Sequence, residues 1–200
     1  MRIQHTNHTL FYSFAATPAS ARVAIDKMVR TMKSHPSLDV VFTVWQHNSS
    51  FTGNMSMSGK AFTLDTPDMK VWFDGKTQWS YPPSADEVNI SEPTADEIAQ
   101  VNPLSILSNL NSSFNFKIAR EGKGRSYIQV IPKKASRDFA SAVVTINTAT
   151  NMPEKLEIKD AKGKITTVTV TSIKGGKKRP AAAYRFPKNK YPKVAIVDLR

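Results

Sequence analysis

The chain has 200 residues, of which 40% are apolar and 22% charged, so it can bury a core in one domain or at most two small ones. Lysine and arginine number 28 against 16 aspartates and glutamates, and the formal charge of +12 favours anionic partners such as nucleic acid, phospholipid headgroups or an acidic protein. The absence of cysteine excludes disulfides, Cys-ligated zinc, iron–sulfur clusters and thiol catalysis, and no apolar run reaches the length of about 18 residues that a membrane-spanning helix needs.

Residues 1–16 have the features of a leader rather than of a folded segment. Arg2 precedes a short apolar stretch at residues 10–16, and Ala19-Ser20-Ala21 fits the small-residue cleavage site of a signal peptide. An expression artefact or a mis-assigned start explains the same residues equally well. In either case residues 17–200 are expected to form a single domain.

A helix is expected to begin at Thr17-Pro18, because threonine caps helices and proline favours the first helical position. An apolar stripe with helical spacing follows, formed by Ile25, Met28, Val29 and Met32. His35-Pro36 ends the helix, because the residue before a proline is pushed out of helical backbone angles.

From residue 38 onward the apolar period changes from 3.6 to 2 residues, which indicates β-strands. The expected strands cover residues 38–46, 54–64, 71–73, 77–81, 87–90, 114–119, 126–132, 139–146, 155–160, 165–173 and 194–197. A change of phase near Lys60 suggests a β-bulge, and Asp74-Gly75 suggests the turn of a hairpin. Short connections between most of these strands favour antiparallel neighbours.

The stretch from Ser91 to Leu110 is helical in character. Thr94 and Glu97 have the spacing of a capping box, and Pro103 can begin a short helix that carries several leucines. The fold class is therefore α+β and mostly β, with one strongly curved antiparallel sheet of about ten to eleven strands and helices on one side.

No catalytic, phosphate-binding or metal-binding motif is present in the sequence. It contains no H-E-x-x-H, G-x-S-x-G, P-loop or G-x-G-x-x-G pattern, and its four histidines are scattered. Acidic neighbours such as Asp86-Glu87 make poor acid/base pairs, because adjacent strand residues point to opposite faces. We therefore expect no enzymatic activity, no cofactor and no metal.

The densest basic cluster consists of Lys174, Lys177, Lys178 and Arg179, and it leaves two interpretations open. It can contact an anionic surface such as lipid or nucleic acid, or it can keep a hairpin turn soluble, which is the more ordinary role. Aromatic and basic residues do alternate, but no RNA-binding signature is present, so nucleic acid is not an expected partner.

Residues 59–81 form a continuous run that ends in D-G-K-T-Q-W-S-Y at positions 74–81. Asn102-Pro103-Leu104 then begins the leucine-rich segment, and the chain closes with Tyr184-Arg185-Phe186-Pro187 and residues 194–200. These features resemble the LolA-type family of bacterial outer-membrane lipoprotein carriers, in a branch found in Bacteroidetes. The resemblance covers about residues 20–200.

This resemblance implies an unclosed, strongly curved antiparallel β-barrel whose helices lid a hydrophobic cavity. It implies a monomeric periplasmic carrier, without a cofactor, that takes acylated lipoproteins from an inner-membrane ABC-type lipoprotein-releasing transporter to an acceptor at the outer membrane. Proteobacterial members carry an arginine tied to cargo release before the D-G-K-T turn, and residues 65–70 contain none, so that role is assigned to no residue. Binding of another lipid or glycolipid, or sensing of envelope stress, are alternatives for the same fold.

A cavity for acyl chains needs only a dry concave face, and strand alternation indicates which residues line it. The residues expected there are Val40, Phe42, Val44, Met55, Met57, Phe62, Leu64, Met69, Val71, Phe73, Trp79, Tyr81, Val88 and Ile90. The residues expected to close it from the helices are Ile25, Met28, Val29, Leu104 and Leu107. A one-residue slip in phase would place Val41, Trp45 and Trp72 there instead.

Overall fold

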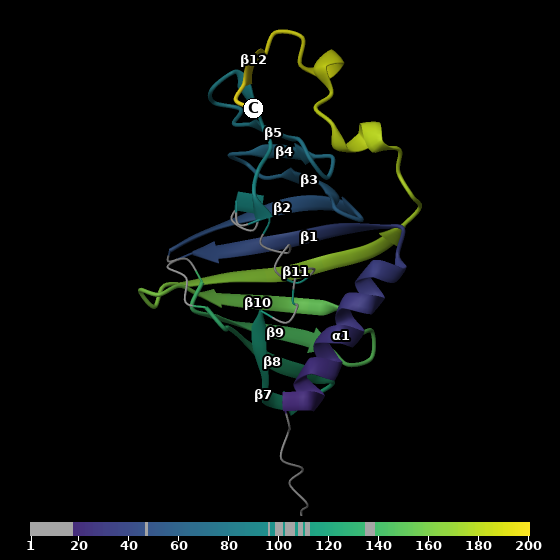
Figure 1. The fold of residues 1–200 in the computed structure, drawn as a ribbon, viewed down its shortest axis with the longest axis vertical. Helices are drawn as coiled ribbons and strands as arrows, with labels where there is room; N and C mark the ends of the chain where they lie inside the picture. Colours follow the sequence, from purple (N-terminus) through teal and green to yellow (C-terminus); the bar gives the residue numbers. More distant parts are fainter. Residues whose placement is uncertain are drawn as a thin grey trace, which may run out of the picture.

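The computed structural model describes residues 18–46, 48–95, 97, 98, 102, 107, 110, 113–134 and 139–200. The leader expected at residues 1–16 lies outside these residues, as do Pro103 and Leu104. Within the described residues, helix α1 (Pro18–Ser34) precedes the strands of one long sheet (Figure 1).

Twelve strands make up this sheet in the described part of the chain. They are β1 (Ser37–Gln46), β2 (Ser49–Ser58), β3 (Ala61–Asp65), β4 (Lys70–Phe73), β5 (Gln78–Tyr81), β6 (Glu87–Ser91), β7 (Phe114–Gly122), β8 (Arg125–Pro132), β9 (Ser141–Asn147), β10 (Pro153–Lys159), β11 (Ile165–Gly176) and β12 (Ala195–Asp198). Their order across the sheet is β12-β6-β5-β4-β3-β2-β1-β11-β10-β9-β8-β7, so β12 and β7 form its two edges and the sheet is not closed.

The expected curved, unclosed antiparallel sheet is confirmed, with a difference at one edge. Strand β12 pairs with β6 in parallel, whereas the other neighbours are antiparallel. The rule that short connections give antiparallel pairs does not apply to β12, because residues 177–194 separate it from β11. Two 3₁₀ turns, η1 (Ala181–Tyr184) and η2 (Lys188–Lys190), lie in that connection.

Helix α1 has the boundaries and the apolar stripe that the sequence predicts. Ile25, Met28 and Met32 are buried, while Arg22 and Asp26 form an ion pair of 2.8 Å on a more exposed side of the helix. The helix contacts β7 and β8, and Figure 1 shows it crossing the end of the sheet formed by β7–β11. We call the face of the sheet that α1 covers the inner face and the opposite one the outer face.

Two tight turns set which side chains of the following strands point inward. Met57 pairs with Phe62 and Ser58 with Ala61, so Gly59-Lys60 is a two-residue hairpin turn, in which Gly59 has a φ of +59°. The expected bulge near Lys60 is therefore wrong, because the change of phase comes from a turn between two strands. The hairpin expected at Asp74-Gly75 is confirmed by the pairing of Phe73 with Gln78.

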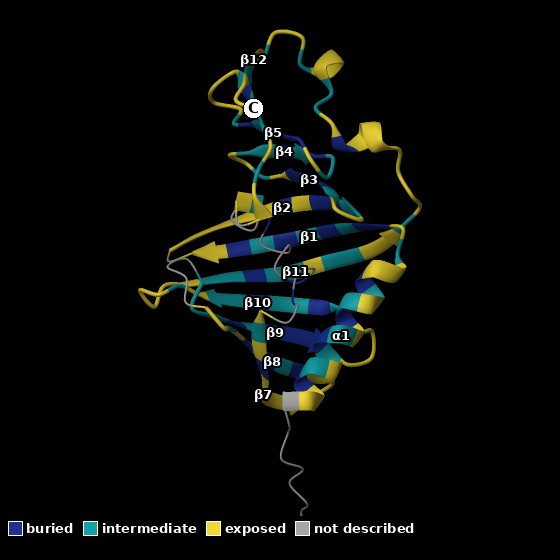
Figure 2. Cartoon of the chain, in the orientation of Figure 1, coloured by how far each residue is buried: buried dark blue, intermediate teal, exposed yellow. Residues whose placement is uncertain are grey.

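Burial alternates along the strands, as the pleat requires. Figure 2 shows buried and less buried residues alternating along β1, where Val40, Phe42 and Val44 are buried but Val41 and Thr43 are only half-buried. The buried members pack with Ile25 and Met28 of α1 in a single apolar cluster, so the core lies on the inner face.

Gly53 illustrates how closely this core is packed. It pairs with Phe42, and a Cβ atom added to Gly53 would lie 2.5 Å from the tip of the Phe42 ring. We expect Gly53→Ala to lower the free energy of unfolding by about 1–3 kcal/mol, because the ring has to leave its position. Urea unfolding measures this, with Asn54→Ala on the exposed neighbour as the control. Equal stability of Gly53→Ala and the wild type would contradict the packing described.

Candidate functional site

The inner face is a continuous apolar surface, and it contains most of the residues that the sequence predicts to line a cavity. Eleven of these are buried members of the apolar cluster: Ile25, Met28, Val40, Phe42, Val44, Met55, Phe62, Leu64, Val71, Phe73 and Leu107. Three more, Val29, Met57 and Met69, are half-buried and pack against it. Leu104 lies outside the described residues.

Four expected members lie on the outer face instead. Phe73 pairs with Gln78 and Val71 with Ser80, so Gln78 and Ser80 are the inward residues of β5. The assignment of Trp79 and Tyr81 to the inner face is therefore wrong. The assignment of Val88 and Ile90 of β6 is wrong for the same reason, because Ile90 pairs with Trp79 and points to the same face. The even number of residues between Phe73 and Gln78 reverses the phase from odd to even positions.

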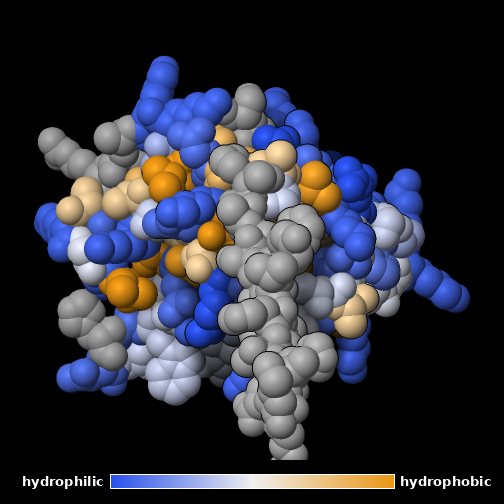
Figure 3. Space-filling model, turned by 90° about the horizontal axis from the view of Figure 1, so that it is seen from below, coloured by the Kyte–Doolittle hydropathy of each residue, from blue (hydrophilic) through white to orange (hydrophobic). Residues whose placement is uncertain are grey.

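The other half of the inner face comes from strands that the sequence-based assignment did not include. Its buried apolar residues are Phe116 of β7, Ile128 and Val130 of β8, Ala142, Val144 and Ile146 of β9, Leu156 of β10 and Val168 of β11. The same alternation that indicates Val40, Phe42 and Val44 is present in these strands and would have found them. Figure 3, seen from the β7 end, shows hydrophobic residues at the surface between hydrophilic ones.

The inner face becomes polar at β5 and β6. Gln78 and Ser80 on β5 lie opposite Ser91 and Asn89 on β6. A groove of about 620 Å³ begins there, and its walls are Gln78, Ser91, Glu92, Pro93, Glu97, Leu199 and Arg200. A second groove, of about 710 Å³, is lined mostly by polar and charged residues of β7–β11, among them Arg125, Thr145 and Glu154.

Residues 177–194, which we call the C-terminal segment, cover part of the outer face of β1–β5. Phe186 and Tyr191 of this segment pack on Trp72 with ring centroids at 5.3 and 5.9 Å, and Tyr191 lies 5.1 Å from Tyr81. We call these four residues the outer aromatic cluster. Trp72 thus packs on the outer face, and Trp45 is 54% exposed. The alternative in which a one-residue slip places Val41, Trp45 and Trp72 on the inner face is therefore wrong.

The four residues of the basic cluster differ in their contacts. Arg179 forms an ion pair with Asp39 at 2.6 Å and donates a hydrogen bond to Ser56 Oγ at 2.6 Å, so it anchors the C-terminal segment to β1 and β2. Lys174, Lys177 and Lys178 are exposed. Of the four residues proposed for an anionic surface, Arg179 is thus engaged within the protein.

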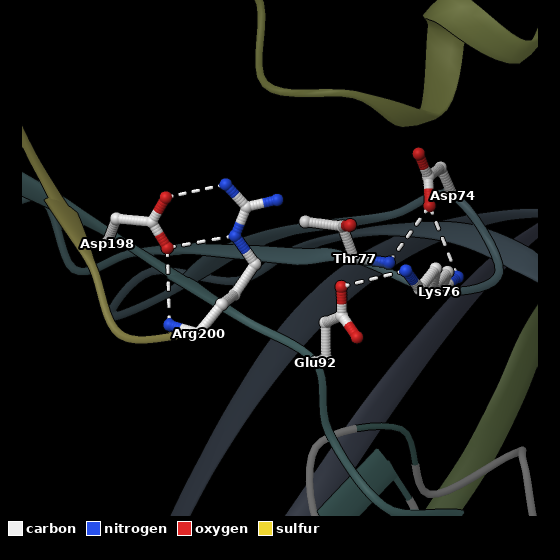
Figure 4. Close-up of polar contacts among 6 residues, drawn as sticks. All are labelled: Asp74, Lys76, Thr77, Glu92, Asp198 and Arg200. Carbon is white, nitrogen blue, oxygen red and sulfur yellow. Dashed lines mark hydrogen bonds and ion pairs between the residues drawn. The ribbon is translucent and has the colours of Figure 1, made fainter.

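Asp74 fixes the hairpin between β4 and β5 and ties it to the C-terminal segment. Its Oδ1 accepts hydrogen bonds from the backbone N–H groups of Lys76 (3.1 Å) and Thr77 (3.0 Å), and its Oδ2 accepts one from Arg185 Nε at 3.0 Å (Figure 4 shows the first two). Burial acts to raise the pKa of Asp74, but these hydrogen bonds and the charge of Arg185 outweigh it and hold the pKa below its usual value.

We expect Asp74→Asn to lower the free energy of unfolding by about 1 kcal/mol at neutral pH, because the contact with the 60% exposed Arg185 is screened by solvent. The lowered pKa means that Asp74 stabilises the fold above the unfolded-state pKa of about 3.9 and that this contribution is lost as the pH falls through the folded-state value. Urea unfolding at neutral pH and at about pH 3 measures both effects. Asp160→Asn is the matched control, since Asp160 also accepts two turn N–H groups. A difference that does not shrink at low pH would contradict this role.

The C-terminal end carries a second carboxylate with a strongly shifted pKa. Hydrogen bonds from the Arg200 guanidinium and its backbone N–H lower the pKa of Asp198 to about 2. Figure 4 shows this pair beside Glu92, which forms its own ion pair with Lys76 at 3.1 Å. The charges at the groove near β6 are therefore largely neutralised by one another.

Neither metal ligation nor a membrane span is found among the described residues. No group of three or more histidine, cysteine, aspartate or glutamate side chains in that part of the chain could hold a metal ion. No helix there is long and apolar enough to cross a membrane.

The sequence model of the family described as "Outer membrane lipoprotein carrier protein LolA" matches residues 11–163, which is most of the chain. The chain belongs to this family. Family membership agrees with the open sheet and its apolar inner face, and it confirms the resemblance drawn from the D-G-K-T-x-W-x-Y motif.

One curated relative shares part of the sequence. An outer-membrane lipoprotein carrier protein of Bordetella avium is 27% identical over 116 residues, which are 56% of this chain and 54% of that protein. The chain thus matches about half the length of this curated relative.

Two solved structures have the same fold. An uncharacterized conserved protein from Thermus thermophilus has 14% identity and a TM-score of 0.62, over 90% of this chain and 99% of that one. A domain from Vibrio parahaemolyticus has 12% identity and a TM-score of 0.51, over 88% of this chain and 99% of that one.

Proposed function

We propose that this protein is a periplasmic carrier that binds the acyl chains of lipoproteins on its inner face and moves them from the inner to the outer membrane. The observation that carries the proposal is the apolar inner face, which runs without interruption from β4 across β1 to β7 and includes Phe73, Phe42 and Phe116. Membership of the lipoprotein carrier family supports the choice of ligand.

The energy for binding comes from removing the acyl chain from water. Each buried CH₂ group contributes about 0.8 kcal/mol, so a chain of about sixteen carbons supplies on the order of 12 kcal/mol before the costs of ordering. This requires no catalytic group, and we propose that the protein is not an enzyme.

The inner face is covered by other parts of the protein in this structure, so an acyl chain has to displace some of these covering residues. Phe42 is only 1% exposed, and α1 together with Leu107 and Leu110 packs on the same cluster. Exchanging contacts between protein side chains for contacts with lipid costs little hydrophobic energy, because both partners are apolar. Met28, Met55 and Met57 suit this exchange, since methionine repacks readily around different shapes.

We further propose that the cargo is taken from an inner-membrane ABC-type transporter, that the protein acts as a monomer and that residues 17–200 are one domain. Release proceeds without the arginine of proteobacterial carriers. In the segment before the D-G-K-T turn, Asp65 of β3 and Lys70 of β4 form an ion pair of 2.6 Å.

Binding of a fluorescent fatty acid, and its displacement by an acylated peptide, tests the proposal. Wild-type protein is expected to bind the probe with micromolar affinity or better and to release it to the acylated peptide. Ile158→Asn, on the half-buried inner side of β10, should weaken binding, while Ile131→Asn, on the exposed outer side of β8, should not. Failure of the wild type to bind, or equal loss in both variants, would contradict the proposal.

Location and catalysis are tested on the same preparation. Osmotic-shock fractionation should recover the protein in the periplasmic extract, with acylated peptide or lipid in the mass spectrum of the purified material. Recovery only with a cytoplasmic marker would contradict the location. Turnover of an ester, glycoside or phosphoester that is lost on substitution of a single polar residue would contradict the absence of catalysis.

A further inference from the structure

Gln78 is a buried polar residue on the inner face, next to its apolar part. It pairs with Phe73 across the β4–β5 ladder, and the Phe73 ring lies 5.3 Å from that of Phe62. A ligand that lies along the apolar inner face toward β6 therefore meets Gln78 where the surface turns polar.

The carboxamide of Gln78 has one end without a partner. Its Nε2 donates a hydrogen bond to Ser80 Oγ at 2.9 Å, while Oε1 is buried and accepts no hydrogen bond from the described residues. The residue is only 7% exposed. A buried oxygen that accepts no hydrogen bond destabilises a protein, and folded proteins rarely retain one. Such an atom indicates that a hydrogen-bond donor outside the described residues binds there.

The charged groups of the adjoining groove already have partners. Glu92 pairs with Lys76, Arg200 pairs with Asp198, and Glu97 accepts hydrogen bonds from the backbone N–H and the hydroxyl of Thr94. Figure 4 shows the first two pairs side by side near the end of β6. The groove therefore has little net attraction for an ion, and what remains without a partner beside it is Gln78 Oε1.

We propose that Gln78 Oε1 accepts a hydrogen bond from an amide N–H at the polar end of an acylated peptide whose chain lies on the inner face. This inference rests on the proposed carrier function and names the part of the cargo that the β5–β6 end receives. The apolar surface from β4 to β7 holds the chain, and the groove lined by Gln78 and Ser91 holds the first peptide unit. Gln78 would thereby favour acylated peptides over lipids that have no N–H group.

Two ligands that differ in one hydrogen-bond donor test this directly. N-dodecanoylglycine methyl ester has an amide N–H, and N-dodecanoylsarcosine methyl ester has the same chain with a methyl group on that nitrogen. Wild-type protein should bind the first about fivefold more tightly than the second, the usual effect of one hydrogen bond. In Gln78→Met the two affinities should become equal. Gln129→Met, on the outward side of β8, should keep the wild-type ratio.

The outcomes separate this inference from the proposed function. If wild-type protein binds both ligands equally well, or if Gln78→Met keeps the fivefold ratio, the inference is overturned while the carrier function stands. If wild-type protein binds neither ligand, the carrier function itself fails. The Gln78→Met protein should fold, because an apolar side chain of similar length removes the unpartnered oxygen. Equal binding of the two ligands by wild-type protein overturns the inference even without the variant.

Discussion

Replacing Phe42 by aspartate is expected to prevent folding of the protein. Phe42 is 1% exposed, and its ring lies over Gly53 in the middle of the inner face. Loss of a buried phenylalanine ring alone costs about 3–5 kcal/mol. An unpaired buried carboxylate costs several more, and the total is comparable with the whole stability of a domain, which is about 5–15 kcal/mol.

Circular dichroism and urea unfolding measure this loss. Phe51→Asp is the matched control, because Phe51 on β2 carries the same side chain but is 37% exposed. Its substitution should leave the sheet intact, with a change in unfolding free energy of no more than about 1 kcal/mol. A Phe42→Asp protein that keeps its sheet signal and unfolds cooperatively would show that the inner face is hollow and hydrated rather than packed.

The affinity of the protein for saturated acyl chains is expected to rise steeply with chain length. Each CH₂ group that enters the inner face contributes up to about 0.8 kcal/mol, or roughly fourfold in affinity, so lengthening a chain from ten to fourteen carbons should strengthen binding by up to roughly 200-fold. The rise should end where the chain fills the inner face, because further CH₂ groups remain in water.

Competition of fatty acids of increasing length against one fluorescent probe measures the series. The carboxylate head is constant, so charge attraction to a protein with a formal charge of +12 cancels in the comparison. Added salt should change all affinities alike and leave the dependence on length unchanged. Affinities that vary with salt but not with chain length would show that the probe binds to the basic surface instead of the inner face.

The strands, and the antiparallel pairing of strands joined by short turns, could be predicted from the sequence because their signals are local. The alternation of Val40, Phe42 and Val44 identified the inward side of β1, and Asp74-Gly75 identified a hairpin. Thr94 and Glu97 form the expected capping box, with the Thr94 N–H donating to Glu97 at 2.7 Å and the Glu97 N–H to Thr94 at 3.3 Å. Such patterns extend over a few residues and need no knowledge of distant segments.

The errors arose where phase or pairing depends on more than the strand itself. Trp79 and Tyr81 continue the odd numbering of Val71 and Phe73, and only the register of the Asp74 turn shows that they point outward. Tyr81 packs instead against Tyr191 of the C-terminal segment, which is far away in the sequence. A buried aromatic residue on a sheet covered on both faces does not reveal which face it occupies.

Photolabelling with a fatty acid that carries a diazirine in the middle of its chain tests most directly whether the inner face binds acyl chains. After irradiation and proteolysis, mass spectrometry should locate adducts on inner-face residues such as Met55, Leu64 and Val71, and excess unlabelled fatty acid should suppress them. The outer aromatic cluster of Trp72, Tyr81, Phe186 and Tyr191 provides the internal control, because it is equally apolar but lies on the other side of the sheet. Adducts confined to the inner face are the expected result. Adducts concentrated on the outer aromatic cluster, or scattered over both faces and insensitive to competitor, would contradict it.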